Sequence, residues 1–106
     1  MIKNFKPPFS RFVKKSHRPL QLVIEDAVDE VCADVTIGEA KLGDLAGIRV
    51  YKFRLNRQEY LMAYRPRSLV EVVDPAAIEW LIIDFYQAGL HENFYDDLKR
   101  YLKTEG

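Results

Sequence analysis

The sequence of 106 residues contains a single cysteine, Cys32, and only two histidines, His17 and His91. One thiol excludes an internal disulfide, and so few cysteines and histidines exclude a zinc site and most other metal sites. No apolar run approaches the roughly 18 residues that a membrane-spanning helix needs. We therefore predict a protein without a bound metal or a membrane span, in which Cys32 is a small core residue.

Signals for secretion and for nucleotide binding are also missing. The first twenty residues are basic and interrupted by prolines, unlike a secretory leader, so we expect a cytoplasmic protein. No glycine-rich loop ends in Lys-Ser or Lys-Thr, and no Gly-x-Ser-x-Gly stretch occurs, so we expect no cofactor and no small-molecule substrate. A composition of 48% hydrophobic and 30% charged residues predicts one folded domain over residues 1–106.

Acidic and basic residues are equal in number, at 16 each, but they are unevenly distributed. Residues 1–24 carry six basic and no acidic side chains, and residues 25–40 carry six acidic and no basic ones. Residues 41–70 carry seven basic side chains against two acidic ones. The simpler interpretation is a mixed, solvated surface. The alternative is a local basic patch on a neutral body, which could hold a polyanion.

Helical periodicity dominates the N-terminal part of the chain. Residues 8–16 place Phe9, Phe12 and Val13 at helical spacing behind a proline. A second helix is predicted over residues 19–35, where apolar side chains follow the i, i+3, i+4, i+7 pattern and acidic ones occupy the opposite face. We expect these two helices to form a hairpin, preceded by a short strand within residues 1–6.

The pattern changes to strands after a glycine-containing loop at residues 36–47. Residues 48–56 alternate with period two, which places Lys52 and Arg54 on one face. A tight turn and a returning strand at 59–65 predict a hairpin, and an apolar run at 77–87 predicts a further, buried strand. A longer connection is expected between them, at residues 65–76.

The last segment, residues 89–103, predicts a closing helix with its acidic side chains near the start and its basic ones near the end. The fold expected from these elements is α+β. An N-terminal helical hairpin would pack on a small antiparallel sheet of three to four strands, followed by the C-terminal helix. The hairpin would cover one sheet face, and the other face would carry the basic strand residues and stay partly open.

Basic strand residues and polar residues of the closing segment could together cleave RNA without a metal ion. A base would remove the proton of a ribose 2′-OH, cations would stabilise the phosphate, and an acid would protonate the leaving oxygen. His91 and Tyr95 are four residues apart, which places them on one side of a helix. The alternative is an ordinary half-exposed strand, a histidine that caps the helix, and a tyrosine at the rim of the core.

Three stretches, residues 43–64, 79–86 and 91–103, together resemble the RelE/ParE superfamily of toxins from bacterial type II toxin–antitoxin modules. The resemblance implies a cognate antitoxin and, for RelE-like members, a metal-independent endoribonuclease that cleaves mRNA on the ribosome. It implies catalytic roles for His91, Tyr95, Lys52 and Arg54. Three further basic residues are RNA-binding candidates: Lys41, Arg49 and Arg65.

Leu61 departs from this pattern, because cleaving members usually have an arginine at that point of the strand. Overall neutrality is also unlike the strongly basic members that act on the ribosome. Both features fit ParE-like relatives, which inhibit DNA gyrase by protein binding. Two functional hypotheses therefore follow, a ribosome-dependent mRNA-cleaving toxin and a gyrase-binding toxin. A third is a degenerate relative that binds a partner without poisoning the cell.

Overall fold

The computed structural model describes residues 1–68 and 81–105. The chain forms, in order, β1 (Ile2–Phe5), α1 (Pro7–Lys15), α2 (Arg18–Ala33), β2 (Glu39–Ala40), the 3-10 helix η1 (Gly43–Leu45), β3 (Arg49–Leu55), β4 (Gln58–Ser68), β5 (Leu81–Leu90) and α3 (Phe94–Glu105). None of the helices in the described residues is long and apolar enough to cross a membrane.

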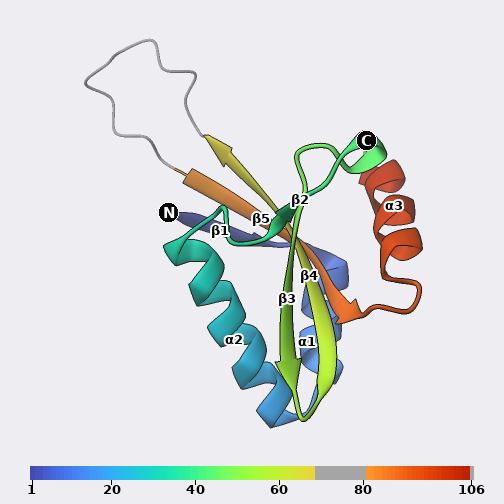
Figure 1. Ribbon diagram of the computed structural model, residues 1–106. Helices are drawn as coiled ribbons and strands as arrows, with labels where there is room; N and C mark the ends of the chain where they lie inside the picture. Colours follow the sequence, from blue (N-terminus) through green and yellow to red (C-terminus); the bar gives the residue numbers. More distant parts are fainter. Residues whose placement is uncertain (69–80, 106) are drawn as a thin grey trace.

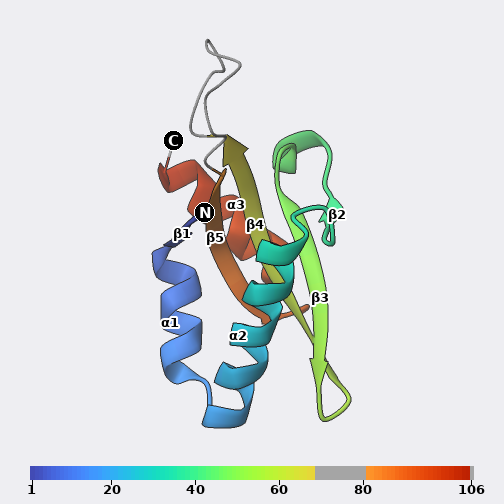
Figure 2. The same cartoon turned by 90° about the vertical axis from the view of Figure 1, so that its left-hand side faces the viewer.

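The five strands make one mixed sheet in the order β1-β5-β4-β3-β2. β1 runs parallel to β5, and every other neighbouring pair is antiparallel. Helices α1 and α2 pack on one face of this sheet, and α3 packs on the other (Figures 1 and 2). The α+β class and both N-terminal helices are confirmed, whereas an antiparallel sheet of three to four strands is wrong. β2 has only two residues, too few to show a periodicity, and the parallel pairing of β1 depends on residues about 80 positions away.

Strand boundaries also differ from the sequence prediction. β4 continues through Pro66 to Ser68, where we expected a connection, and β5 continues to Leu90, past the expected end at residue 87. Pro66 fits in β4 because the pairing of β4 with β3 ends at Tyr64, so this part of β4 pairs only with β5. A proline has no backbone N–H to donate, and it is tolerated where a strand has a partner on one side only. The remainder of the expected connection, and the expected first residues of the last strand, lie outside the described residues.

β5 contains a β-bulge and contributes side chains to two hydrophobic cores, one on each face of the sheet. Tyr64 is opposite Phe85 and Ala63 is opposite Gln87, so Tyr86 is the extra residue. Phe85 packs into the core beneath α1 and α2, whereas Tyr86 packs into the core beneath α3. Both faces of β5 are therefore buried, which explains its nearly continuous apolar sequence.

Tyr64 fixes the path of the chain where α2 leads into the sheet. The Tyr64 ring is fully buried, and its hydroxyl donates to the Val35 carbonyl at 2.8 Å and accepts from the Gly38 N–H at 2.9 Å. A Cβ at position 38 would lie 2.7 Å from that hydroxyl oxygen, so only glycine fits without displacing the ring. Arg49 adds two hydrogen bonds, to the carbonyls of Thr36 and Gly38.

Asp84 ties three strands together, although it is one of the most deeply buried polar residues. Its carboxylate accepts hydrogen bonds from Arg67 at 2.6 and 3.1 Å and from Asn4 at 3.0 Å. Burial by itself raises the pKa of a carboxyl group, but the hydrogen bonds from Arg67 and Asn4 outweigh burial and hold the pKa of Asp84 below its usual value.

We expect Tyr64→Phe to lower the free energy of unfolding by about 1–3 kcal/mol, because it leaves a buried N–H and a carbonyl without their partner. Urea denaturation measures this change. Tyr60→Phe is the matched control on the same strand, since the half-buried Tyr60 ring contributes mainly by stacking on Phe53. An equal effect of the two substitutions would contradict the role given to the Tyr64 hydroxyl.

Asp84 should make the stability of the protein dependent on acid pH. Its pKa is lower in the folded chain than in the unfolded chain, so its contribution is present above about pH 4 and is lost as the pH falls through the folded-state pKa. We expect Asp84→Asn to be less stable at neutral pH and to lose less stability on acidification. Thermal unfolding at several pH values tests this, with exposed Asp26→Asn as the control.

Candidate functional site

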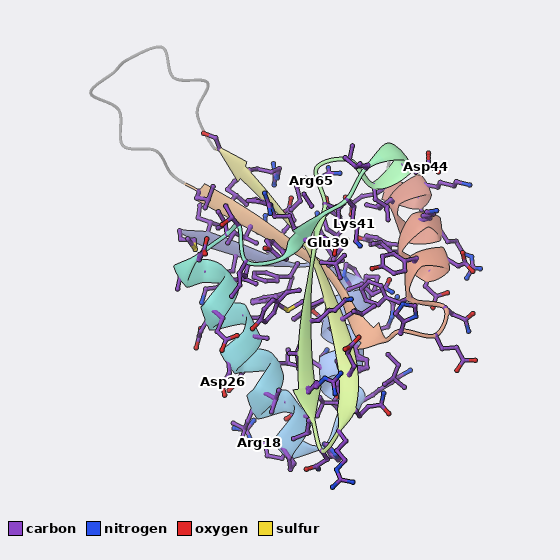
Figure 3. The ribbon with its side chains drawn as sticks, viewed as in Figure 1. Arg18, Asp26, Glu39, Lys41, Asp44 and Arg65 are labelled. Carbon is purple, nitrogen blue, oxygen red and sulfur yellow. The ribbon has the colours of Figure 1, made fainter. Side chains whose placement is uncertain are left out.

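A group of polar side chains lies on the face of the sheet that α3 covers only in part. We call Glu39, Lys41, Lys52, His91 and Tyr95 the α3-side cluster. Glu39 and Lys41 come from β2 and the residue after it, Lys52 from β3, and the two ring residues from the turn before α3 and its first turn. Figure 3 labels Glu39 and Lys41, which lie on the edge strand β2 that pairs with β3 and on the residue after it.

Lys41 is the centre of this cluster. Its Nζ lies 2.7 Å from Oε1 of Glu39 and 5.3 Å from the centroid of the Tyr95 ring. The hydrogen bond to Glu39 raises the pKa of Lys41, while burial opposes the rise and Tyr95 adds to it. The same hydrogen bond lowers the pKa of Glu39, and the charge of Lys52 lowers it further. An ammonium group and a carboxylate thus stay charged beside a phenol.

His91 and Tyr95 meet through the turn that starts α3. α3 begins only at Phe94, so the prediction that His91 lies on the helix is wrong. A turn with a left-handed Asn93 (φ 60°) and a Phe94 N–H bonded to the His91 carbonyl brings the two rings together instead. Their centroids lie 5.9 Å apart with the rings nearly perpendicular. His91 is exposed and Tyr95 is half-buried.

The other basic candidates do not join the cluster. Arg54 forms an ion pair with Glu59 at 3.3 Å near the end of the β3–β4 hairpin. Arg49 belongs to the opposite face, where its guanidinium holds backbone carbonyls. Arg65 stacks over the Tyr86 ring at 5.6 Å, and its Nε is buried without a hydrogen-bond partner among the described residues.

Leu61 shows what the departure from the RelE-like pattern means in space. It pairs with Lys52 across the β3–β4 ladder, and its side chain is fully buried in the core beneath α3. The residue of β4 directly opposite Lys52 is therefore apolar, where a cleaving member usually has an arginine. Arg65 on the same strand is four residues away, about 13 Å along a strand, so it lies at a different part of the face.

Glu39 is the member of the cluster that the sequence prediction missed. It lay within a segment assigned as loop, where a single acidic residue carries no periodic signal. The useful signal was its spacing from Lys41, because residues two apart in an extended segment point to the same side. Carboxylate, ammonium, phenol and imidazole groups together can perform acid–base chemistry. Within the described residues, no group of histidine, cysteine, aspartate or glutamate side chains could hold a metal ion.

Comparison with known proteins identifies a family across most of the chain. A family model described as the ParE-like toxin of the type II bacterial toxin–antitoxin system matches residues 4–99. The match runs from the second half of β1 through the first half of α3, and it includes every member of the α3-side cluster. No curated protein and no solved structure gives a match.

We expect Glu39→Gln to lower the pKa of Lys41, because the substitution removes the carboxylate that is the main cause of the raised value. A larger neutral fraction makes a lysine more nucleophilic, so Lys41 should react faster with an acylating reagent at pH 9. Mass spectrometry of the labelled peptide measures the rate. Glu59→Gln, which removes the partner of Arg54, should leave the rate at Lys41 unchanged. Equal labelling rates in the two variants would argue against the ion pair between Glu39 and Lys41.

Proposed function

Because this chain belongs to the ParE-like toxins of type II toxin–antitoxin systems, we propose that it arrests growth by binding a protein target, DNA gyrase, and does not cleave RNA. Family membership implies a cognate antitoxin as its partner. The proposed target acts inside the cell, so the toxin would work in the cytoplasm.

The observation that carries this proposal is the engagement of the basic residues within the protein itself. Among residues 41–67, four basic side chains are bound to carboxylates or carbonyls and one is stacked on a tyrosine: Lys41, Arg49, Arg54, Arg67 and Arg65. Proteins bind RNA largely by neutralising phosphates with free lysine and arginine side chains. Five of the seven basic side chains between residues 41 and 67 thus have a partner within the protein, and the chain has zero net charge; both features favour a protein surface over a polyanion as the target.

Leu61 supports the same conclusion. A metal-free ribonuclease must stabilise the charge that develops on the phosphate, and preorganised cations do this best. The residue beside Lys52 on β4 is a buried leucine, so Lys52 has no second cation from that strand. Removing one such electrostatic contact from a catalytic site typically lowers kcat by about 100- to 1,000-fold.

RNA cleavage is the second candidate, and the α3-side cluster is the observation that favours it. Lys41 lies over the Tyr95 ring. The ring of His91, from the turn before α3, packs nearly perpendicular to the same tyrosine ring. In a cleavage reaction, Glu39 or His91 would take the proton of the 2′-OH, whose oxygen would attack the phosphorus. Lys41 would stabilise the phosphate, and the phenol of Tyr95 would give a proton to the departing 5′ oxygen.

Induced expression in a bacterial host, followed by two assays, separates these functions. We expect growth arrest, loss of negative supercoiling in a reporter plasmid, and no new 5′ ends in primer extension on a translated messenger. His91→Ala and Tyr95→Phe should not produce or remove any messenger ends. Purified protein should inhibit supercoiling by purified gyrase, which excludes an indirect effect of arrest.

New 5′ ends that disappear in His91→Ala and Tyr95→Phe would overturn the proposal and establish the nuclease. Lys99→Ala on the exposed surface of α3 is the control, because Lys99 lies outside the cluster. Arrest without either effect would exclude both gyrase and mRNA as targets. No arrest at all would indicate a relative that has lost its toxicity.

A further inference from the structure

Half of β5 has a strand on one side only. β4 pairs with β5 along its whole length, whereas β1 pairs with residues Ile82–Phe85 alone. The last bond on that side runs from the Lys6 N–H to the Phe85 carbonyl. Pro7 and Pro8 then start α1, so the chain turns away from the sheet. Residues Tyr86–Leu90 are left with an edge whose outward N–H and C=O groups face no strand in the described part of the chain.

This edge forms the floor of a groove between two helices. Figure 1 shows the end of β5 between α1 and α3. The groove has a volume of about 590 Å³, with Ala88 and Gly89 on its floor and Arg11 and Lys15 on the α1 wall.

The other free edges of the described sheet carry charged residues, including Glu39 on β2 and Arg65 and Arg67 on the part of β4 that pairs only with β5. β1 has four residues and carries Lys3, and the outer edge of β3 beyond its two-residue pairing with β2 carries exposed Lys52 and Arg54. Charged side chains on edge strands usually prevent the addition of another strand. The stretch Tyr86–Leu90 contains no charged residue. Its edge is thus the one in the described sheet that is both uncharged and set between helices.

We propose that the cognate antitoxin binds in this groove by adding an extended segment of about five residues as a sixth strand beside Tyr86–Leu90. Main-chain hydrogen bonds give such an added strand its affinity, and pockets for alternate side chains give its specificity. The proposal rests on the family membership, which implies the antitoxin, and not on the choice between gyrase and RNA as the target.

Charge specifies the chemistry of the added segment. Successive side chains of a strand point to opposite faces, so every second one would face the α1 wall. Arg11 and Lys15 make that wall basic, and neither forms an ion pair with an acidic residue of the described ranges 1–68 and 81–105. The α3 side of the groove is instead lined by two acidic residues, Glu92 and Asp97, of which Asp97 is paired with Arg100. The segment should therefore carry acidic residues at alternate positions, on the side that faces α1.

Hydrogen–deuterium exchange locates the segment directly. The probe is the small protein encoded beside this gene, co-expressed with the toxin and purified as the complex. We expect the outward-facing amides within Tyr86–Leu90 to exchange at least tenfold more slowly in the complex than in the free toxin. Amides of β1 and of residues 51–55 in β3 serve as internal controls. Slowing at either of those edges, with Tyr86–Leu90 unchanged, would overturn the proposal.

Two adjacent lysines of α1 provide a matched pair of variants. Lys15 lines the groove, whereas Lys14 lines a separate groove between α1 and α2. Lys15→Glu should raise the Kd of the complex by tenfold or more, and Lys14→Glu, with the same change in charge, by less than threefold. Equal effects, or failure of the two proteins to form a complex, would overturn the assignment. Neither assay measures gyrase inhibition, so failure here leaves the proposed target untouched.

Discussion

The buried hydroxyl of Tyr64 is the contact on which the position of the α3-side cluster depends. It holds the backbone at Val35 and Gly38, so the chain that leaves α2 enters the sheet at one place only. Glu39 follows at once and pairs with Val50, and this pairing places Glu39 and Lys41 beside β3. Because Gly38 has no room for a side chain, the hydroxyl and the glycine constrain each other. A residue in the core beneath α1 and α2 thus determines where the polar side chains lie on the α3 face.

The helices cover the two faces of the sheet to different extents. Two helices cover most of one face, whereas α3 and η1 cover only part of the other, and the polar cluster occupies the uncovered part. β5 serves both cores because its successive side chains point to opposite faces, as Phe85 and Tyr86 do. A rigid, doubly covered centre with functional groups at its margin keeps those groups in place without burying them.

Periodicity predicted the elements that bury one face. The α2 stripe and the alternation in β3 were read correctly, because each presents a regular apolar side to the core beneath α1 and α2. Two strands could not be recognised from hydrophobic periodicity. β5 is buried on both faces and β2 has two residues, so neither carries an alternating pattern. The count of charges along the sequence suggested a basic patch. Ion pairs depend on which side chains meet in the folded protein, so the carboxylate partners of Arg54 and Arg67 could be identified only from the structure. The predicted family was confirmed by the match over residues 4–99.

The parallel pairing of β1 with β5 joins residues about 80 positions apart, and this has a consequence for biosynthesis. β5 lies between β1 and β4, so the sheet stays incomplete until nearly the whole chain has left the ribosome. Contacts of such long sequence separation form late, because closing the intervening loop costs entropy before any contact is gained. The strand that joins β1 to the rest of the sheet is therefore among the last parts of the chain to be made, and the fold can close only when synthesis is nearly finished.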